Sequence, residues 1–218
     1  MKKFIVSAVM AVITCMPMLA QSELLNNPNN KAYFGLRVGA DIACPGKITA
    51  DKVSVSTFKN GAGIEFGGIY NIPVVANFYI EPGVKLYYDT YSLNDEMLDA
   101  LDLTGYSFRK FGMRIPVMAG YHFDFTEDIK VSVFTGPELE IGIWGREYAK
   151  DGKYKDSANM YGDDGLKRVN VLWGIGAGVS YQRYYLGFNG GIGMVNMISE
   201  SGTKFHENRV TISLGYNF

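Results

Sequence analysis

The sequence is poor in the residues that build disulfides and metal centres. It contains two cysteines and two histidines among 218 residues, and Cys15 falls in a segment that we expect to be removed. One remaining thiol forms no internal disulfide, and Cys44, His122 and His206 are too few good ligands for a zinc cluster. Neither a G-x-G-x-x-G motif before a helix nor a G-x-S-x-G nucleophile motif occurs. We therefore expect no cofactor.

Long apolar runs are scarce as well, and the clearest one is at the start. Lys2 and Lys3 precede an uncharged stretch that ends at Ala20, which is the order of a cleaved secretory signal peptide. The stretch is marginal in length for a transmembrane helix, and a lipoprotein signal would require cleavage before Cys15. We expect a signal peptide over residues 1–20, followed by a short periplasmic segment over 21–32.

Charge is the third scarce property. Charged residues make up 20% of the chain. Once the two lysines of the signal peptide are removed from 21 basic residues, 19 remain against 22 acidic ones, a net charge of −3. This balance offers no electrostatic attraction to nucleic acid, and we expect no such partner.

Glycine and aromatic residues, in contrast, are abundant, with 26 glycines and an aromatic share of 14%. Apolar and polar residues alternate with a period of two in one segment after another, which is typical of β-strands. In the last segment, for example, Ile212 and Leu214 alternate with Ser213 and Gly215. The alternation predicts eight strands of membrane-spanning length, over residues 33–42, 61–70, 77–89, 110–123, 129–144, 169–182, 184–194 and 208–218.

The connections between these strands alternate in length. Long polar segments lie at 43–60, 90–107, 145–168 and 195–207, and short turns lie at 71–76, 124–128 and Arg183. This pattern is typical of an outer-membrane barrel with both termini in the periplasm and its long loops outside. Aromatic residues at strand ends are expected to form girdles at the two interfaces. The periplasmic girdle would contain Phe34, Tyr70, Phe78, Tyr121, Phe123, Tyr181, Tyr184, Tyr216 and Phe218, and the outer girdle Tyr88 and Trp173.

The choice between a membrane barrel and a soluble, lipocalin-like barrel depends on which set of residues faces inward. The polar set is rich in glycine, which weakens a solvated strand but makes room inside a narrow barrel. The apolar set is large and continuous, as contact with lipid requires. We therefore predict an all-β, eight-stranded antiparallel up-and-down transmembrane β-barrel over 33–218, surrounded by lipid in the bacterial outer membrane.

The polar set then places charges of both signs in the lumen. Isolated buried ions are costly, and an eight-stranded barrel is about as wide as its side chains require. We therefore predict a paired network that fills the lumen, with Arg114 and Glu138 as one pair. The expected network contains Arg37, Asp41, Glu65, Glu81, Lys85, Asp89, Lys110, Arg114, Lys130, Glu138, Glu140 and Arg209.

Several short motifs carry a family resemblance. Arg114-Ile115-Pro116-Val117 runs into Gly120-Tyr121-His122-Phe123, Gly136-Pro137 lies in the fifth strand, and Leu214-Gly215-Tyr216-Asn217-Phe218 ends the sequence. With these motifs the chain resembles the PorT-like outer membrane β-barrel family of the Bacteroidetes type and, more distantly, OmpX and the OmpA transmembrane domain. The resemblance implies that the barrel-assembly machinery reads the terminal aromatic residue. It also implies a role in protein secretion or, for OmpX-like members, in surface adhesion.

The function that we prefer is that of a non-enzymatic barrel, a structural or interaction component of the envelope that acts through its long loops. The segment 145–168 has more aromatic and Met residues than a merely solvated loop needs. We expect a protein partner to contact Tyr148, Tyr154, Met160 and Tyr161. The connection 90–107 is expected to hold a short helix capped by Asn94.

Two alternatives stay open. A small lipid-modifying enzyme would use His206 with Ser199 or Ser201 at the outer rim, although no third member of a triad can be assigned. A minor channel or small-solute binder would use the charged lumen.

Overall fold

The computed structural model describes residues 31–50, 53–161, 165–200 and 202–218. The signal peptide expected over 1–20, and residues 21–30 of the expected periplasmic segment, lie outside the described residues.

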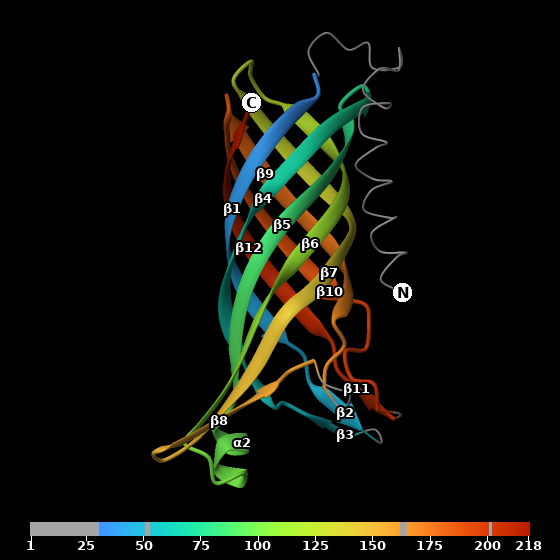
Figure 1. Ribbon diagram of the computed structural model, residues 1–218. Helices are drawn as coiled ribbons and strands as arrows, with labels where there is room; N and C mark the ends of the chain where they lie inside the picture. The colour runs from blue at the N-terminus through green and yellow to red at the C-terminus, as the bar shows by residue number, and fades with distance from the viewer. Residues whose placement is uncertain (1–30, 51–52, 162–164, 201) are drawn as a thin grey trace.

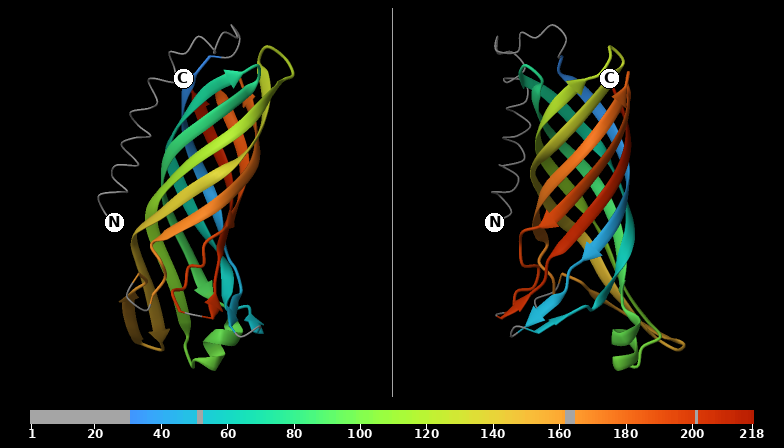
Figure 2. Two further views of the ribbon diagram at one scale, coloured as in Figure 1. Left: turned by 90° about the vertical axis from the view of Figure 1, so that its right-hand side faces the viewer. Right: turned by 180° about the vertical axis from the view of Figure 1, so that it is seen from behind.

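Within the described residues, eight strands close into one antiparallel barrel (Figures 1 and 2). Each strand pairs with its neighbours in the ring order, and the first pairs with the last through Gly35–Pro45 and Glu207–Asn217. The predicted all-β, up-and-down barrel is therefore confirmed. The ring is formed by β1 (Tyr33–Pro45), β4 (Phe58–Val75), β5 (Phe78–Leu93), β6 (Gly105–Asp124), β7 (Ile129–Asp151), β9 (Val169–Tyr181), β10 (Tyr184–Gly193) and β12 (Glu207–Asn217).

The long connections lie together at one end of the barrel, which we call the loop end, and the C-terminus lies at the opposite turn end (Figure 1). The prediction that 90–107 and 145–168 are loops is wrong in part. β5, β6 and β7 continue into these segments, and β8 (Tyr154–Asn159) extends the sheet by pairing with the end of β7. In the extension of β7, charged residues occur on both faces, as Arg146 and Glu147 show, so the apolar alternation disappears although the backbone ladder continues.

Smaller elements complete the loop end. The helix α2 (Asp95–Ala100) confirms the helix expected there, and the Asn94 side chain accepts a hydrogen bond from the Met97 backbone N–H at 2.9 Å. The segments 43–60 and 195–207 contribute a small three-stranded sheet, made of β2 (Ile48–Ala50), β3 (Val53–Val55) and β11 (Thr203–Lys204).

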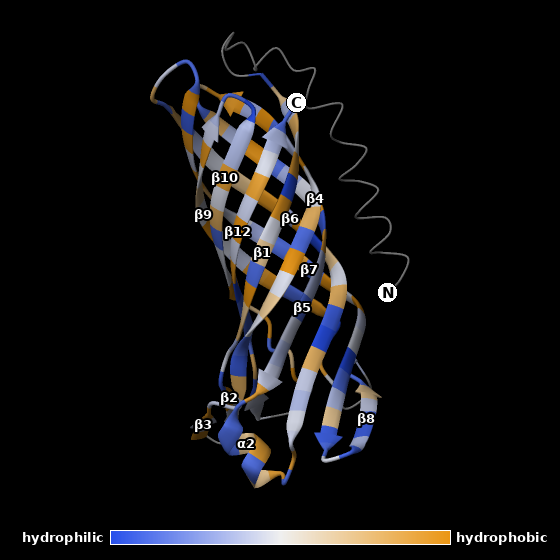
Figure 3. Cartoon of the chain, turned by 90° about the vertical axis from the view of Figure 1, so that its left-hand side faces the viewer, coloured by the Kyte–Doolittle hydropathy of each residue, from blue (hydrophilic) through white to orange (hydrophobic). Residues whose placement is uncertain are grey.

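The outer wall of the barrel is apolar and the inner wall is polar, as the alternation predicts. On β1, Val38 is 53% exposed, whereas Arg37 and Asp41 are each 3% exposed. Figure 3 shows hydrophobic residues recurring along the barrel strands, and more hydrophilic ones around β8. Among the described residues, no helix is long and apolar enough to cross a membrane.

Aromatic side chains gather at the turn end. Phe218 lies 5.0 Å from Tyr216 and 6.0 Å from Phe34 between ring centroids. A second group joins Phe78, Tyr121 and Phe123, with Tyr121 4.8 Å from each of the other two. These contacts join members of the expected periplasmic girdle at the end of the barrel that holds the short turns.

One β-bulge changes the face of β7. The register steps from Gly112↔Gly142 to Phe111↔Trp144, so Ile143 is an extra residue. Strict alternation would turn Trp144 inward, but it is 38% exposed on the outer wall. The bulge therefore directs Trp144 and the residues that alternate with it outward, which the sequence pattern alone does not predict.

Candidate functional site

The lumen is organised around the Arg114 side chain on β6, which is fully buried. Its three guanidinium nitrogens donate to carboxylates from β1, β4, β5 and β7, and the Tyr87 ring lies 4.0 Å from the guanidinium carbon. The four donor–acceptor distances are 2.6 Å to Asp41, 3.1 Å to Glu65, 2.5 Å to Asp89 and 2.9 Å to Glu140. One cation thus joins four strands across the barrel.

Three further cations extend this cluster. Lys85 contacts Glu65 at 2.6 Å, and Arg209 contacts Glu138 at 2.7 Å. Lys110 bridges Glu140 at 3.0 Å and Glu207 at 2.6 Å. The connected network thus combines four basic with six acidic side chains. The expected pair of Arg114 with Glu138 is wrong, because Arg114 is directly opposite Glu140 in the β6–β7 register and Glu138 pairs with Arg209.

Glu207 is a network member that the sequence reasoning missed. It is buried, and the Tyr91 hydroxyl donates to its Oε1 at 2.8 Å while Lys110 binds Oε2. The last strand was expected to begin at Asn208, so Glu207 was assigned to a loop. The signal was present nonetheless, because Glu207 continues the inward period of Arg209 and Thr211.

Three of the expected network residues lie outside this cluster. Arg37 donates to the Asn217 side-chain oxygen at 2.8 Å and stacks over Tyr185, 4.0 Å from the ring centroid. Glu81 accepts a hydrogen bond from Asn71, 3.2 Å away. Lys130 lies near the turn end, 3.8 Å from Asp124, with its side chain 30% exposed. None of the three joins the Arg114 cluster among the described residues.

Tyrosine rings fill much of the space that inner-wall glycines leave. Tyr79 lies against Gly120, and Tyr87 lies against Gly112. Both tyrosines are buried, at 3% and 2% exposure. From the sequence we expect long ionic side chains in this space, but aromatic rings occupy a large part of it as well. A side chain at either glycine would collide with the ring, so ring and glycine form one packing unit.

Nearer the turn end, His122 belongs to a separate polar group. Its Nδ1 lies 3.0 Å from the Ser132 hydroxyl and its Nε2 lies 3.5 Å from the Asn71 amide nitrogen. The Tyr79 ring stacks on the imidazole at 4.0 Å between centroids. This buried group holds β4, β6 and β7 together from the inside.

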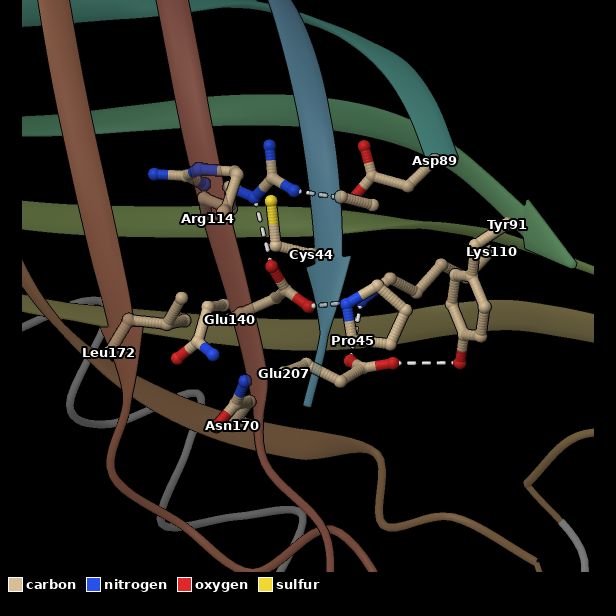
Figure 4. A pocket seen from close by; sticks show the side chains of 13 residues that line it. Cys44, Pro45, Asp89, Tyr91, Lys110, Arg114, Glu140, Asn170, Leu172 and Glu207 are labelled. Atoms are coloured by element: carbon tan, nitrogen blue, oxygen red, sulfur yellow. Dashed lines mark hydrogen bonds and ion pairs between the residues drawn. The ribbon is translucent and has the colours of Figure 1, made fainter. Parts of the chain in front are cut away.

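A small cavity lies beside the Arg114 cluster on its loop-end side (Figure 4). Its volume is about 10 Å³, and Glu140, Asn170 and Glu207 are among its lining residues. This is about the space of one water molecule. At this level, side chains occupy the lumen.

The mouth above this cavity is closed by side chains from the loop end. Met160 is 3% exposed and packs with Tyr91 and Ala43, and Tyr161 packs against the same cluster. The expectation that Met160 and Tyr161 are contact residues for a partner is therefore corrected. β8 folds back along β7 and carries these two residues inward, where their apolar surface covers the mouth.

The other two residues expected in the interaction loop do lie on the surface. Tyr154 is 83% exposed at the tip of the β7–β8 hairpin. Tyr148 is partly buried beneath Arg109, whose guanidinium carbon lies 4.9 Å from the ring centroid.

The described residues form grooves at the loop end. One, of about 580 Å³, is lined by Lys59, Leu98, Tyr106, Arg109, Tyr148 and Lys150 among others. A smaller one, of about 270 Å³, is lined by Ile143, Trp144, Arg146, Asn159 and Arg168 among others. The larger groove falls within the size range of small-molecule sites.

The residues named for an enzymatic alternative do not form a catalytic pair in the described chain. Within the described residues, the His206 imidazole makes no hydrogen bond to Ser199, and its Nδ1 has no partner. Ser201 lies outside the described residues. No group of three or more His, Cys, Asp and Glu residues that could hold a metal ion occurs in the described chain either.

Comparison with known proteins gives a family match. The family model described as "Outer membrane protein beta-barrel domain" matches residues 19–216. The comparison with curated proteins gave no match.

Several solved structures are similar at low identity. Ail, the attachment invasion locus protein of Yersinia pestis, in complex with the heparin analogue sucrose octasulfate, is 11% identical, with a TM-score of 0.45 over 87% of this chain and 100% of that one. Neisserial surface protein A is 14% identical, with a TM-score of 0.46 over 87% and 100%. OprG of Pseudomonas aeruginosa is 10% identical, with a TM-score of 0.47 over 86% and 95%.

Proposed function

We propose that this chain, which belongs to the family of outer membrane protein β-barrel domains and lies in the bacterial outer membrane, acts without catalysis as an interaction component of the envelope. Its loop end recognises the partner, and its filled lumen keeps the barrel closed and stable. The loop end is taken to face the outside of the cell, as in other barrels with short turns at the periplasmic side.

The observation that supports this proposal is the contrast between the centre of the lumen and the loop end. The side chains of the Arg114 cluster form ion pairs with one another and leave a cavity of only about 10 Å³. The loop end, in contrast, extends β6, β7 and β8 away from the barrel and borders a groove of about 580 Å³ with basic and aromatic walls. Side chains at the centre of the lumen are committed to one another, whereas those of the groove are available to a partner.

The finer resemblance to PorT-like proteins belongs to this proposal as well. It is supported by the Arg114-Ile115-Pro116-Val117 motif, whose first residue is the centre of the lumen cluster. A PorT-like role would link the loop end to protein secretion, and an OmpX-like role would link it to adhesion. The two differ in the partner, which is a protein of the export route in the first case and a surface outside the cell in the second.

The proposal is tested by trimming the loop end. One variant replaces residues 94–104 with an Asn-Gly turn, and a second replaces residues 149–156 in the same way, which keeps Met160 and Tyr161 in the mouth. We expect both to show the heat-modifiable gel mobility of a closed barrel but to fail to complement the envelope phenotype of a deletion strain. The control replaces the turn 125–128 at the other end and should complement.

The opposite result would overturn the proposal. If the trimmed barrels complement and a folded Glu138→Gln variant does not, the function resides in the lumen.

A further inference from the structure

The outer wall above the bulge carries a row of cations directly beyond the aromatic residues. Tyr88, Phe111 and Trp144 face outward and lie directly opposite one another on β5, β6 and β7, in one rung of the sheet, that is, one row of cross-strand partners. The next rung toward the loop end pairs Arg109 with Arg146. Successive rungs on one face are about 6.6 Å apart along a strand. The wall therefore changes from aromatic to cationic within a single rung.

The positions of these cations lower the stability of the sheet locally. Arg109 lies directly opposite Arg146, and Lys150 lies directly opposite Lys155. Like charges in such positions repel each other across a sheet. Among the described residues, none of the four forms an ion pair with a carboxylate, and the other cation lining the larger groove, Lys59, is paired with Asp95 on α2.

The acids of the same hairpin lie on the other face. In the strand register Glu147, Asp151 and Asp156 alternate with Arg146, Lys150 and Lys155. They therefore belong to the lumen-side face, where the Tyr106 hydroxyl donates to Glu147 at 2.6 Å. The bulge at Ile143 sets this arrangement, because without it Arg146 and Lys150 would face the lumen side. The hairpin thus separates its charges, with cations on the outer wall and acids behind them.

A third arginine, Arg168, lies behind the row where β7 exchanges one neighbour for another, and its guanidinium carbon stacks over the Tyr161 ring, 4.8 Å from the centroid. β9 pairs with β7 up to Ile141, and β8 pairs with it from Arg146. In the gap, Arg168 Nη1 donates to the carbonyls of Gly142 and Ile143 at 3.3 and 3.1 Å. The groove of about 270 Å³ lies here, and Arg146 and Arg168 line it above Trp144.

We propose that this outer-wall row, made of Arg109 and Arg146, binds the phosphate groups of anionic lipids in the membrane leaflet at the loop end. The inference goes beyond the recognition role and does not depend on it, since lipid surrounds the barrel whatever its partner is. Aromatic side chains sit at the boundary between hydrocarbon and headgroups, so cations one rung further out meet the phosphates. Planar guanidinium groups match phosphate oxygens with paired hydrogen bonds. The repulsion between Arg109 and Arg146 is relieved when an anion lies between them.

The two tryptophans of the chain allow a direct test. Trp144 lies below the row and Trp173 lies on β9, so Trp173→Phe leaves a reporter at the site and Trp144→Phe leaves one elsewhere on the wall. Each barrel is placed in phosphatidylcholine nanodiscs with brominated phosphatidylglycerol or brominated phosphatidylcholine as the minor lipid. We expect the anionic lipid to be enriched about five-fold around Trp144, the factor for one arginine near an anionic surface, but not around Trp173.

The matched variants separate the site from general charge. Arg109→Gln with Arg146→Gln should remove the preference of Trp144 for the anionic lipid, and Arg183→Gln, an exposed arginine at the turn end, should leave it unchanged. The double variant loses the contact of Arg109 with the Tyr148 ring but no side-chain hydrogen bond to a backbone carbonyl, so it should fold. In zwitterionic detergent it should unfold at the same or a higher denaturant concentration than the parent, because a repulsive pair is removed.

Three results would overturn the proposal. The first is equal quenching of Trp144 by the two brominated lipids. The second is a preference that survives in the folded double variant. The third is loss of the preference when soluble inorganic phosphate or an acidic polysaccharide is added at the concentration of the lipid, which would show that the row takes a soluble anion instead.

Discussion

Arg114 and Arg146 lie on neighbouring strands of one hairpin, yet their surroundings differ completely. Arg114 is fully buried and binds four carboxylates, whereas Arg146 is exposed, lies opposite another arginine, and has no ion pair among the described residues. The same residue type thus serves two purposes. Inside the barrel its charge is compensated by the chain itself, which stabilises the closed ring. On the outer wall its charge is left for something that is not part of the chain.

The largest loss of stability should come from removing the Arg114 charge from the lumen cluster. Arg114→Leu leaves Asp41, Glu65, Asp89 and Glu140 without their shared cation, and removal of one partner from a buried ion pair costs about 3–5 kcal/mol. We expect a loss of this size in the free energy of unfolding, measured by denaturant titration in lipid vesicles. Arg183→Leu, at an exposed turn, is the control and should change stability by no more than about 0.5 kcal/mol. Equal effects of the two changes would show that the cluster does not stabilise the barrel.

The next largest effect distinguishes the two faces of β12. Leu214 is 59% exposed on the outer wall, and the neighbouring Ser213 alternates with it on the inner wall. Leu214→Arg should cost about 2–4 kcal/mol near the bilayer midplane, whereas Ser213→Arg should cost less because it faces the polar lumen. Folding yield in lipid vesicles measures both. The reverse order would contradict the assignment of the faces.

A smaller effect tests which partners the lumen residues choose. Glu138→Gln and Arg209→Gln should be coupled in a double-mutant cycle by about 0.5–3 kcal/mol, as residues in contact are. The same cycle between Glu138 and Arg114 should give a smaller value, since Arg114 contacts other carboxylates directly. Coupling of Glu138 to Arg114 in place of Arg209 would contradict the pairing described above.

The ion-pair partners in the lumen could not be predicted from the sequence. The eight strands and their two faces follow from local alternation, because the membrane imposes a period of two on every spanning segment. Which residue meets which across the barrel depends on the register between strands. Arg114 and Asp41 are far apart in sequence and meet only because the ring closes with a particular stagger. The choice between Glu138 and Glu140 as the partner of Arg114 therefore required the structure.

At the loop end, the sequence predicted only the features that depend on residues close together in the chain. Asn94 caps α2 by a contact within one turn, so its role could be read from the sequence. Met160 was expected at the surface because it lies in a polar segment, but the β7–β8 hairpin returns it to the mouth. The bulge at Ile143 leaves no distinct mark in the sequence, although it decides that Trp144 and Arg146 face outward. The row of cations on the outer wall was missed for this reason.

The smallest effect is expected at the Lys150–Lys155 pair on the outer wall, and it should be a gain in stability where the changes above cause a loss. Lys155→Glu places a carboxylate opposite Lys150 and converts a repulsive cross-strand pair into an attractive one, which stabilises such pairs by about 0.2–1 kcal/mol. The hairpin of β7 and β8 extends beyond the barrel, so the gain should appear locally, as slower amide hydrogen exchange over residues 146–159 with unchanged global unfolding. Lys155→Gln, which removes the repulsion without adding attraction, should give an intermediate value. A faster exchange in Lys155→Glu would mean that the lysines already share an anionic partner from the chain, and would remove the contrast with the lumen at this position. Slower exchange would mean that the hairpin carries its positive charge at a cost to its own stability.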